Sequence, residues 1–164
     1  MSFSLYPGEY LDSVYRIDFD RLYEEGYRGV IFDIDNTLAP HGAPADRRAV
    51  ALFAKLRALG FACILLSNNK EPRVKSFAGA VGAAYMHKAG KPKPSAYQKA
   101  MAAIGTNRAT TIFVGDQIFT DVFGANLAGI RTILVKPMNP KEEIQIVLKR
   151  YLEKVVLFFY NRRK

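Results

Sequence analysis

The sequence predicts an α/β fold, a single Rossmann-like domain with a mostly parallel central sheet and helices on both faces. Short apolar runs alternate with longer amphipathic stretches along the 164 residues, as expected for strands joined by crossover helices. Several of the apolar runs end in acidic or hydroxyl residues. Polar side chains at the carboxyl ends of parallel strands mark the edge where such sheets bind ligands. The length fits one domain, residues 1–164.

The first clear strand begins at Val30 and runs into Asp33 and Asp35. Asn36 and the Pro-His-Gly cluster at 40–42 end that strand and open a loop. Hydrophobic periodicity predicts the remaining elements: strands over 61–66, 83–86, 110–114 and 131–135, and helices over 45–59, 72–80, 95–104, 119–128 and from 141 to about 160. Residues 1–27 show only a loose helical stripe and are interpreted as an N-terminal extension.

The predicted loops at the ligand-binding edge carry a chemically coherent set of side chains: Asp33, Asp35, Ser67, Lys91, Asp116 and Asp121. Converging carboxylates need a divalent cation, and oxygen ligands without cysteine or histidine favour Mg²⁺. A carboxylate near such a cation can attack phosphorus, and a neighbouring carboxylic acid can protonate the leaving group. A hydroxyl and an ammonium group can hold the other phosphoryl oxygens. This set predicts phosphoryl-transfer chemistry.

Four ordered motifs make the chain resemble phosphatases of the haloacid dehalogenase (HAD) superfamily: Asp-Ile-Asp-Asn-Thr at 33–37, Ser67 after an apolar strand, Lys-Pro-Lys-Pro at 91–94, and Gly-Asp at 115–116 with Asp121. The resemblance implies that Asp33 is the nucleophile and a metal ligand. It implies that Asp35 is the general acid and base and gives the metal its backbone carbonyl. It further implies that Asp116 completes the Mg²⁺ site, that Asp121 supports it, and that the phosphoryl group is bound by Thr37, Ser67, Asn68 and Lys91. Lys88 and Lys93 are the alternatives to Lys91.

The spacing of the motifs leaves no room for an inserted cap domain, so the chain resembles the capless subclass III. Within that subclass it is similar to the YqeG branch, whose relatives dephosphorylate phosphatidylglycerophosphate. We therefore expect a magnesium-dependent phosphomonoester hydrolase that works through an aspartyl-phosphate, with phosphatidylglycerophosphate as the candidate substrate. The alternatives are a phosphatase of another metabolite or macromolecule, or a non-catalytic binding protein of HAD fold. The last alternative predicts loss of a catalytic aspartate, yet all are present.

The net charge of +9 favours anionic partners. We expect no nucleic-acid partner, because no recognised nucleic-acid-binding module is apparent. Neither a secretory signal nor a membrane span is visible. The sequence thus predicts a cytoplasmic protein, either free or peripheral to the inner face of the membrane. His41 follows the first motif and is either solvated or a substrate contact.

The C-terminal segment 141–164 predicts an amphipathic basic helix. Basic residues flank an apolar stripe that recurs at helical spacing. The stripe consists of Ile144, Leu148, Tyr151, Leu152, Val155 and Phe159. One interpretation is a terminal helix packed on the sheet through this stripe. The other is a membrane-interface helix, because residues 155–160 are apolar all round. The sequence leaves these alternatives open, along with a contact between two copies.

Overall fold

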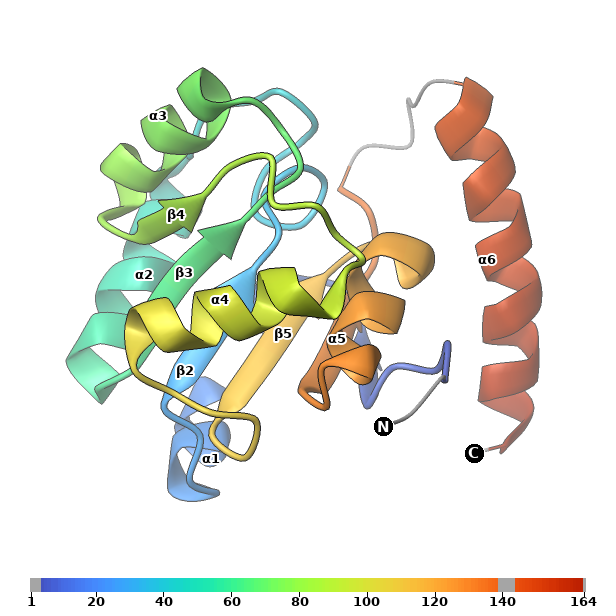
Figure 1. Cartoon of the computed structure of the whole chain (residues 1–164), viewed down its shortest axis with the longest axis horizontal. Helices are drawn as coiled ribbons and strands as arrows, with labels where there is room; N and C mark the ends of the chain where they lie inside the picture. Colours follow the sequence, from blue (N-terminus) through green and yellow to red (C-terminus); the bar gives the residue numbers. More distant parts are fainter. Residues whose placement is uncertain (1–3, 139–143, 164) are drawn as a thin grey trace.

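The computed structural model describes residues 4–138 and 144–163 and confirms the predicted α/β fold. Six strands form one sheet in the order β1-β6-β5-β2-β3-β4, and every neighbouring pair is parallel (Figure 1). The strands are β1 Glu9–Leu11, β2 Gly29–Phe32, β3 Ala62–Leu66, β4 Ala84–Met86, β5 Thr111–Gly115 and β6 Arg131–Val135. The helices are η1 Val14–Arg16, α1 Phe19–Glu24, α2 Arg47–Leu59, α3 Glu71–Val81, α4 Pro94–Ile104, η2 Ile118–Val122, α5 Phe123–Leu127 and α6 Ile144–Arg163.

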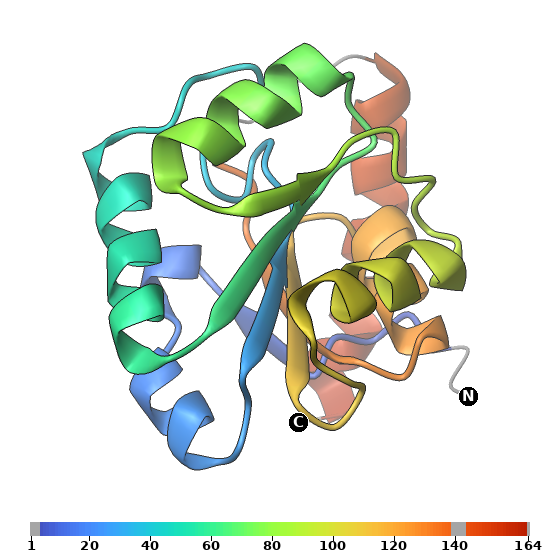
Figure 2. The same cartoon turned by 60° about the vertical axis from the view of Figure 1, so that its left-hand side comes forward.

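Both faces of the sheet are buried, as a parallel sheet requires. Val30 and Phe32 of β2 point to one face and pack with α1, α2 and α3, whereas Ile31 points to the other and packs with α4 and α5. Figure 2 shows α1 and α2 on one side of the sheet and α4 on the opposite side. The central strand is therefore apolar at every position, and its first polar side chain comes where it ends.

The structure differs from the sequence-based expectation in two regions. The stretch interpreted as an N-terminal extension holds η1 and α1, and Phe19 and Leu22 of α1 are buried in the core. Residues 9–11 form β1, which pairs with β6 and adds an edge strand that was not predicted. The predicted helix over 119–128 begins as a π-helix, η2, and continues as α5. A π-helical turn inside a helix often marks a functional site.

The chain between Asp33 and Lys91 consists of loops and the elements α2, β3, α3 and β4. All of these belong to the α/β layers, so no cap domain is inserted there, as predicted.

Helix α6 lies against the side of the domain formed by η2 and the edge of the sheet (Figure 1). Val156 and Leu157 pack on a small cluster of Ile118, Val122 and Leu134. Residues 141–143, where the sequence predicted this helix to begin, lie outside the described residues, as does the side chain of Ile144. Among the helices of residues 4–138 and 144–163, none has the length and apolar character needed to cross a membrane.

Candidate active site

The ends of three neighbouring strands bring the predicted motifs together. Strand β2 lies between β5 and β3, and Phe32 is in register with Val114 on one side and Leu65 on the other. Asp33 therefore leaves the sheet beside Gly115, and its backbone N–H donates to the Val114 carbonyl at 3.0 Å. Because all strands run in the same direction, the loops that follow them share one edge of the sheet.

Three carboxylates and one ammonium group form the centre of the site. Oxygens of Asp33, Asp116 and Asp121 all lie within 4.8 Å of one another, and all three residues are buried. Lys91 Nζ donates to Asp33 Oδ1 at 2.9 Å and to Asp121 Oδ1 at 2.8 Å. The exposed fraction of the Lys91 side chain is 4%, so this cation is held inside the acidic cluster. Lys88 and Lys93, the alternatives that the sequence left open, are exposed.

The turn after β5 explains how Asp121 reaches the cluster. The Asp121 N–H donates to the Gln117 carbonyl at 2.9 Å, and its Oδ2 accepts from the Gln117 N–H at 3.1 Å. A Cβ atom on Gly115 would lie 2.6 Å from Asp121 Oδ2. Position 115 must therefore be glycine for the Asp121 carboxylate to occupy this place beneath the strand end.

Burial and mutual charge set the protonation of the cluster. Burial raises the pKa of Asp33 to about 7, although the Lys91 ammonium opposes that shift. Burial also raises the pKa values of Asp116 and Asp121. For Lys91, burial alone would lower the pKa, but the Asp121 and Asp33 carboxylates outweigh it and raise the pKa above its ordinary value. When all three carboxylates are ionised, they carry one charge more than Lys91 and Arg150 of α6 together balance, so the cluster favours a further cation.

Asp35 points away from this cluster into a separate set of polar contacts. Its Oδ1 accepts from Arg73 Nη2 at 2.9 Å and from the Gly42 N–H at 2.8 Å, and its Oδ2 lies 3.4 Å from Asn69 Nδ2. Burial would raise the pKa of Asp35, but these contacts, led by the Gly42 N–H and Arg73, hold it below its usual range. The pKa values of the two aspartates of the first motif are thus shifted in opposite directions, that of Asp33 upward and that of Asp35 downward.

A turn at Asn36 directly follows these two aspartates. Asn36 has a φ of 63°, in the left-handed region that asparagine tolerates better than most residues. The Thr37 and Leu38 N–H groups both donate to the Ile34 carbonyl, at 3.1 and 2.9 Å. Thr37 Oγ1 then donates to Asp116 Oδ1 at 3.2 Å, which ties the first motif to the fourth.

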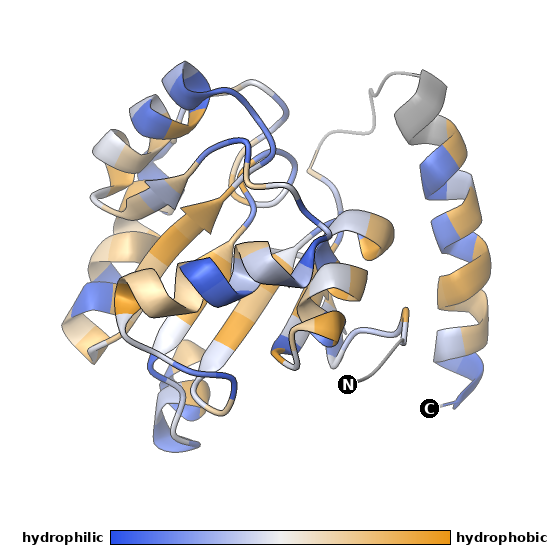
Figure 3. Cartoon of the chain, in the orientation of Figure 1, coloured by the Kyte–Doolittle hydropathy of each residue, from blue (hydrophilic) through white to orange (hydrophobic). Residues whose placement is uncertain are grey.

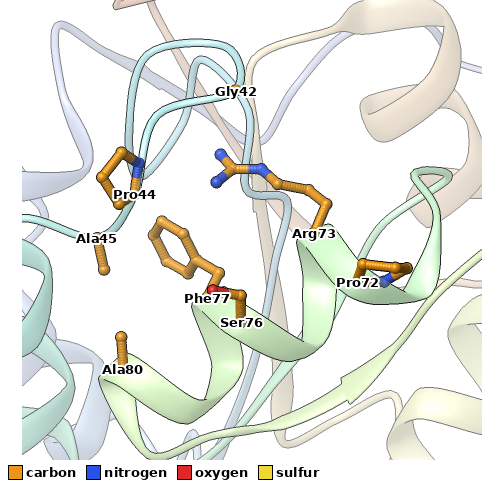
Figure 4. Close-up of a pocket in the computed structure, with 8 residues that line it drawn as sticks. All are labelled: Gly42, Pro44, Ala45, Pro72, Arg73, Ser76, Phe77 and Ala80. Carbon is orange, nitrogen blue, oxygen red and sulfur yellow. The ribbon is translucent and has the colours of Figure 1, made fainter.

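A pocket of about 340 Å³ lies between the loop that follows β2 and helix α3 (Figure 4). Gly42 and Arg73, both of which bond to Asp35, lie on its wall together with Pro44, Ala45, Pro72, Ser76, Phe77 and Ala80. Figure 4 shows the Arg73 side chain reaching from α3 towards the loop that holds Gly42.

The second motif positions the loop that carries Lys91. Ser67 is buried, and its Oγ accepts from the Asn69 N–H at 3.1 Å. Asn68 Oδ1 accepts from the Lys91 N–H at 2.8 Å and from the Gly90 N–H, while its Nδ2 donates to the Lys91 carbonyl at 3.1 Å. The Asn68 amide therefore fixes the Lys91 backbone, and its predicted part in phosphate binding stays a prediction.

Two arginines of the site were not predicted as functional residues. Arg73 holds Asp35, and Arg150 of α6 contacts both the backbone carbonyl and the carboxylate of Asp116. Glu153, one turn along α6, pairs with Arg150 at 3.2 Å and accepts from the Ile118 N–H at 2.9 Å. The sequence signals only that both arginines belong to basic segments. His41 is exposed.

The donor set fits a hard divalent cation. The three clustered residues offer carboxylate oxygens, the ligands that Mg²⁺ prefers. The side chain of Asp35 lies outside this group, and its backbone carbonyl as a metal ligand stays a prediction.

Comparisons with known proteins agree with this geometry. The sequence profile of the HAD-hydrolase-like family matches residues 88–141. The Bacillus subtilis protein named "Probable phosphatase YqeG" is 32% identical over 158 residues, which cover 96% of this chain and 92% of that protein. The chain belongs to the YqeG family of HAD phosphatases.

Two further matches place this YqeG-family phosphatase among its relatives. The Arabidopsis thaliana phosphatidylglycerophosphate phosphatase 1 is 30% identical over 159 residues, and the match covers 84% of this chain but 45% of that protein. The cobalt-bound structure of the deoxy-D-mannose-octulosonate 8-phosphate phosphatase YrbI from Haemophilus influenzae superposes with a TM-score of 0.51 at 15% identity. That superposition covers 69% of this chain and 80% of YrbI and shows the shared fold.

Proposed function

We propose that this chain is a magnesium-dependent phosphomonoesterase that forms an aspartyl-phosphate on Asp33, and that its substrate is a phosphorylated lipid headgroup, with phosphatidylglycerophosphate as the first candidate. The observation that carries the proposal is the cluster of Asp33, Asp116 and Asp121 around Lys91 Nζ. Such a cluster can hold a cation and a phosphoryl group next to a carboxylate nucleophile.

The reaction proceeds in two balanced steps. A carboxylate oxygen of Asp33 attacks phosphorus, and the bond between phosphorus and the ester oxygen breaks. Asp35 gives its proton to the departing alkoxide. In the second step, the Asp35 carboxylate takes a proton from water, the hydroxyl attacks phosphorus, and the bond to Asp33 breaks, releasing phosphate and restoring both aspartates.

Other residues orient and neutralise the phosphoryl group. Lys91 supplies a buried positive charge next to Asp33, where charge develops on the phosphoryl oxygens. Ser67 supplies a hydroxyl from the neighbouring loop. Asp33 and Asp116, with the backbone carbonyl of Asp35, would hold Mg²⁺, and Asp121 would support them. The cation, when bound, neutralises phosphoryl charge and offsets the repulsion between these carboxylates.

The lipid substrate is supported by the lack of an inserted cap and by the relatives. Between Asp33 and Lys91 the chain holds no cap domain, so a large group attached to the phosphate meets no lid inserted there. The named activity of the Arabidopsis relative is phosphatidylglycerophosphate dephosphorylation. This chain spans about half the length of that relative, and the same substrate is proposed for it.

Phosphate release tests both parts of the proposal. The purified chain is assayed with p-nitrophenyl phosphate, glycerol 3-phosphate and phosphatidylglycerophosphate in mixed micelles, with Mg²⁺ or with chelator. We expect turnover with Mg²⁺ only, loss of turnover in Asp33→Asn, and the highest kcat/KM for the lipid. Activity that survives in chelator or in Asp33→Asn would refute the mechanism. A preference for glycerol 3-phosphate over the lipid would refute the proposed lipid substrate but not the proposed mechanism.

A further inference from the structure

Helix α6 has a continuous apolar face that the domain leaves uncovered, which we call the α6 apolar face. Its six side chains are each between 47% and 66% exposed: Leu148, Tyr151, Leu152, Val155, Phe158 and Phe159. Among the described residues, the large exposed hydrophobic side chains are these six and Val50 of α2. Figure 3 shows apolar residues along most of α6, including the side turned away from the sheet.

The opposite side of α6 is fixed to the domain, so the apolar face cannot turn inward. Glu153 is buried and accepts from the Ile118 N–H, and Arg150 contacts Asp116. Tyr160 is buried beside Tyr6, with ring centroids 5.5 Å apart. The described part of the predicted apolar stripe, from Leu148 to Phe159, therefore does not pack on the sheet. The terminal helix does pack on the domain, but through other residues, among them Val156 and Leu157.

The charges around the α6 apolar face identify its partner. The exposed charged side chains of residues 148–163 are all basic: Lys154, Arg162 and Arg163. The one acidic residue in this range, Glu153, is buried and paired with Arg150. Apolar residues edged by lysine and arginine suit an anionic lipid leaflet. A second copy of the same face would bring like charges together, which opposes self-association.

The position of α6 places this face close to the catalytic cluster. Arg150 contacts the metal ligand Asp116 from one side of the helix, while Leu148 and Leu152 are exposed. A leaflet on the outer side would thus lie about one helix diameter, roughly 10–12 Å, from Asp116. The α6 apolar face and the catalytic cluster thus lie on opposite sides of the same helix.

We propose that the α6 apolar face docks the phosphatase on an anionic lipid leaflet, with Lys154 and Arg162 contacting lipid phosphates. This docking rests on the proposed function and deepens it, since it brings a phosphatase without an inserted cap to a lipid-borne phosphate. Its binding step requires neither catalysis nor Mg²⁺.

Vesicle co-sedimentation of the full chain tests the docking. Vesicles of phosphatidylcholine alone are compared with vesicles containing phosphatidylglycerol, using wild type and two double variants. Leu152→Ser with Phe159→Ser removes apolar contact, and its control is Val50→Ser on α2. Lys154→Gln with Arg162→Gln removes charge, and its control is Lys75→Gln with Lys99→Gln, which changes exposed lysines elsewhere. Circular dichroism and hydrolysis of p-nitrophenyl phosphate verify that each variant is folded.

Wild type and both controls should bind the anionic vesicles, and each α6 variant should bind roughly tenfold more weakly or worse. Absence of wild-type binding, equal binding to neutral vesicles, or α6 variants that match their controls would overturn the docking. Sedimentation velocity that shows a dimer lost in Leu152→Ser with Phe159→Ser would overturn it too, in favour of a second copy. Vesicle binding without any phosphatase turnover would support the docking and refute the proposed function.

Discussion

Arg150 reaches from helix α6 to the predicted metal ligand Asp116 and contacts both its carboxylate and its backbone carbonyl. The Arg150 side chain is 14% exposed and the Asp116 side chain is fully buried. A positive charge therefore stands next to a carboxylate that is proposed to bind Mg²⁺. The Arg150 guanidinium and a Mg²⁺ ion bound by Asp116 would both be positive, and two like charges this close repel each other strongly where water is scarce.

Removing this arginine should tighten metal binding. We expect Arg150→Gln to bind Mg²⁺ several-fold more tightly than wild type, measured by isothermal titration calorimetry without substrate. Lys149→Gln is the matched control, because Lys149 is the neighbouring cation and contacts Gln117 rather than Asp116. Weaker binding in Arg150→Gln would mean that the arginine orients Asp116 for the metal rather than competing with it.

Asp33 should make the metal-free protein less stable as pH rises. Its pKa is raised to about 7, so the folded state holds a proton that the unfolded chain releases near pH 4. Its stabilising contribution is present below pH 4 and is lost as pH rises to about 7. The free energy of unfolding of Asp33→Asn minus that of wild type should therefore increase between pH 4 and pH 7, by a few kcal/mol at most. Urea unfolding in chelator at several pH values measures it, and a constant difference would contradict the shift.

Lys91 should be needed for stability as well as for turnover. Lys91→Met leaves the buried carboxylates of Asp33 and Asp121 without their shared partner, and breaking a buried ion pair in this way costs about 3–5 kcal/mol. Lys93→Met changes an exposed lysine of the same loop and should leave both properties near wild type. Chemical unfolding measures the stability of the two variants, and phosphate release measures their turnover. Equal effects of Lys91→Met and Lys93→Met on stability and turnover would contradict the central role of Lys91 in the site.

Arg73 should set the pH at which Asp35 acts as an acid. Loss of the ion pair in Arg73→Gln should raise the pKa of Asp35, because the Arg73 guanidinium helps to hold it below its usual range. With an alkyl phosphate, whose leaving group needs a proton, the alkaline decline of the phosphorylation burst should then move to higher pH. Lys70→Gln, an exposed neighbour, is the control. An unmoved alkaline decline in Arg73→Gln would show that Asp35 is not the titrating acid.

The sequence predicted the part of the site that depends on strand ends. Asp33, Ser67 and Asp116 each follow a buried apolar run, and parallel strands bring such positions to one edge whatever the loops do. Lys91 was identifiable because its loop begins with a distinctive proline pattern. The central strands were likewise predictable from uninterrupted apolar residues.

Features that depend on distant contacts were not predictable from local patterns. Strand β1 has three partly exposed residues and exists because β6 offers it a free edge. Arg73 and Arg150 reach the site from helices, and their sequence surroundings resemble any basic surface segment. The spacing of apolar residues in α6 revealed a stripe but not its direction, which is set by Glu153 and Tyr160 on the opposite side of the helix.

The most direct test of the account is chemical trapping of the phosphorylated enzyme. The chain is mixed with Mg²⁺ and excess substrate, quenched in acid and reduced with borohydride, which converts an acyl-phosphate of aspartate into homoserine. Peptide mass mapping should then find homoserine at position 33 and aspartate at positions 35, 116 and 121. Homoserine at another of these positions, or none at any of them in a sample that turns over substrate, would contradict the central role of Asp33.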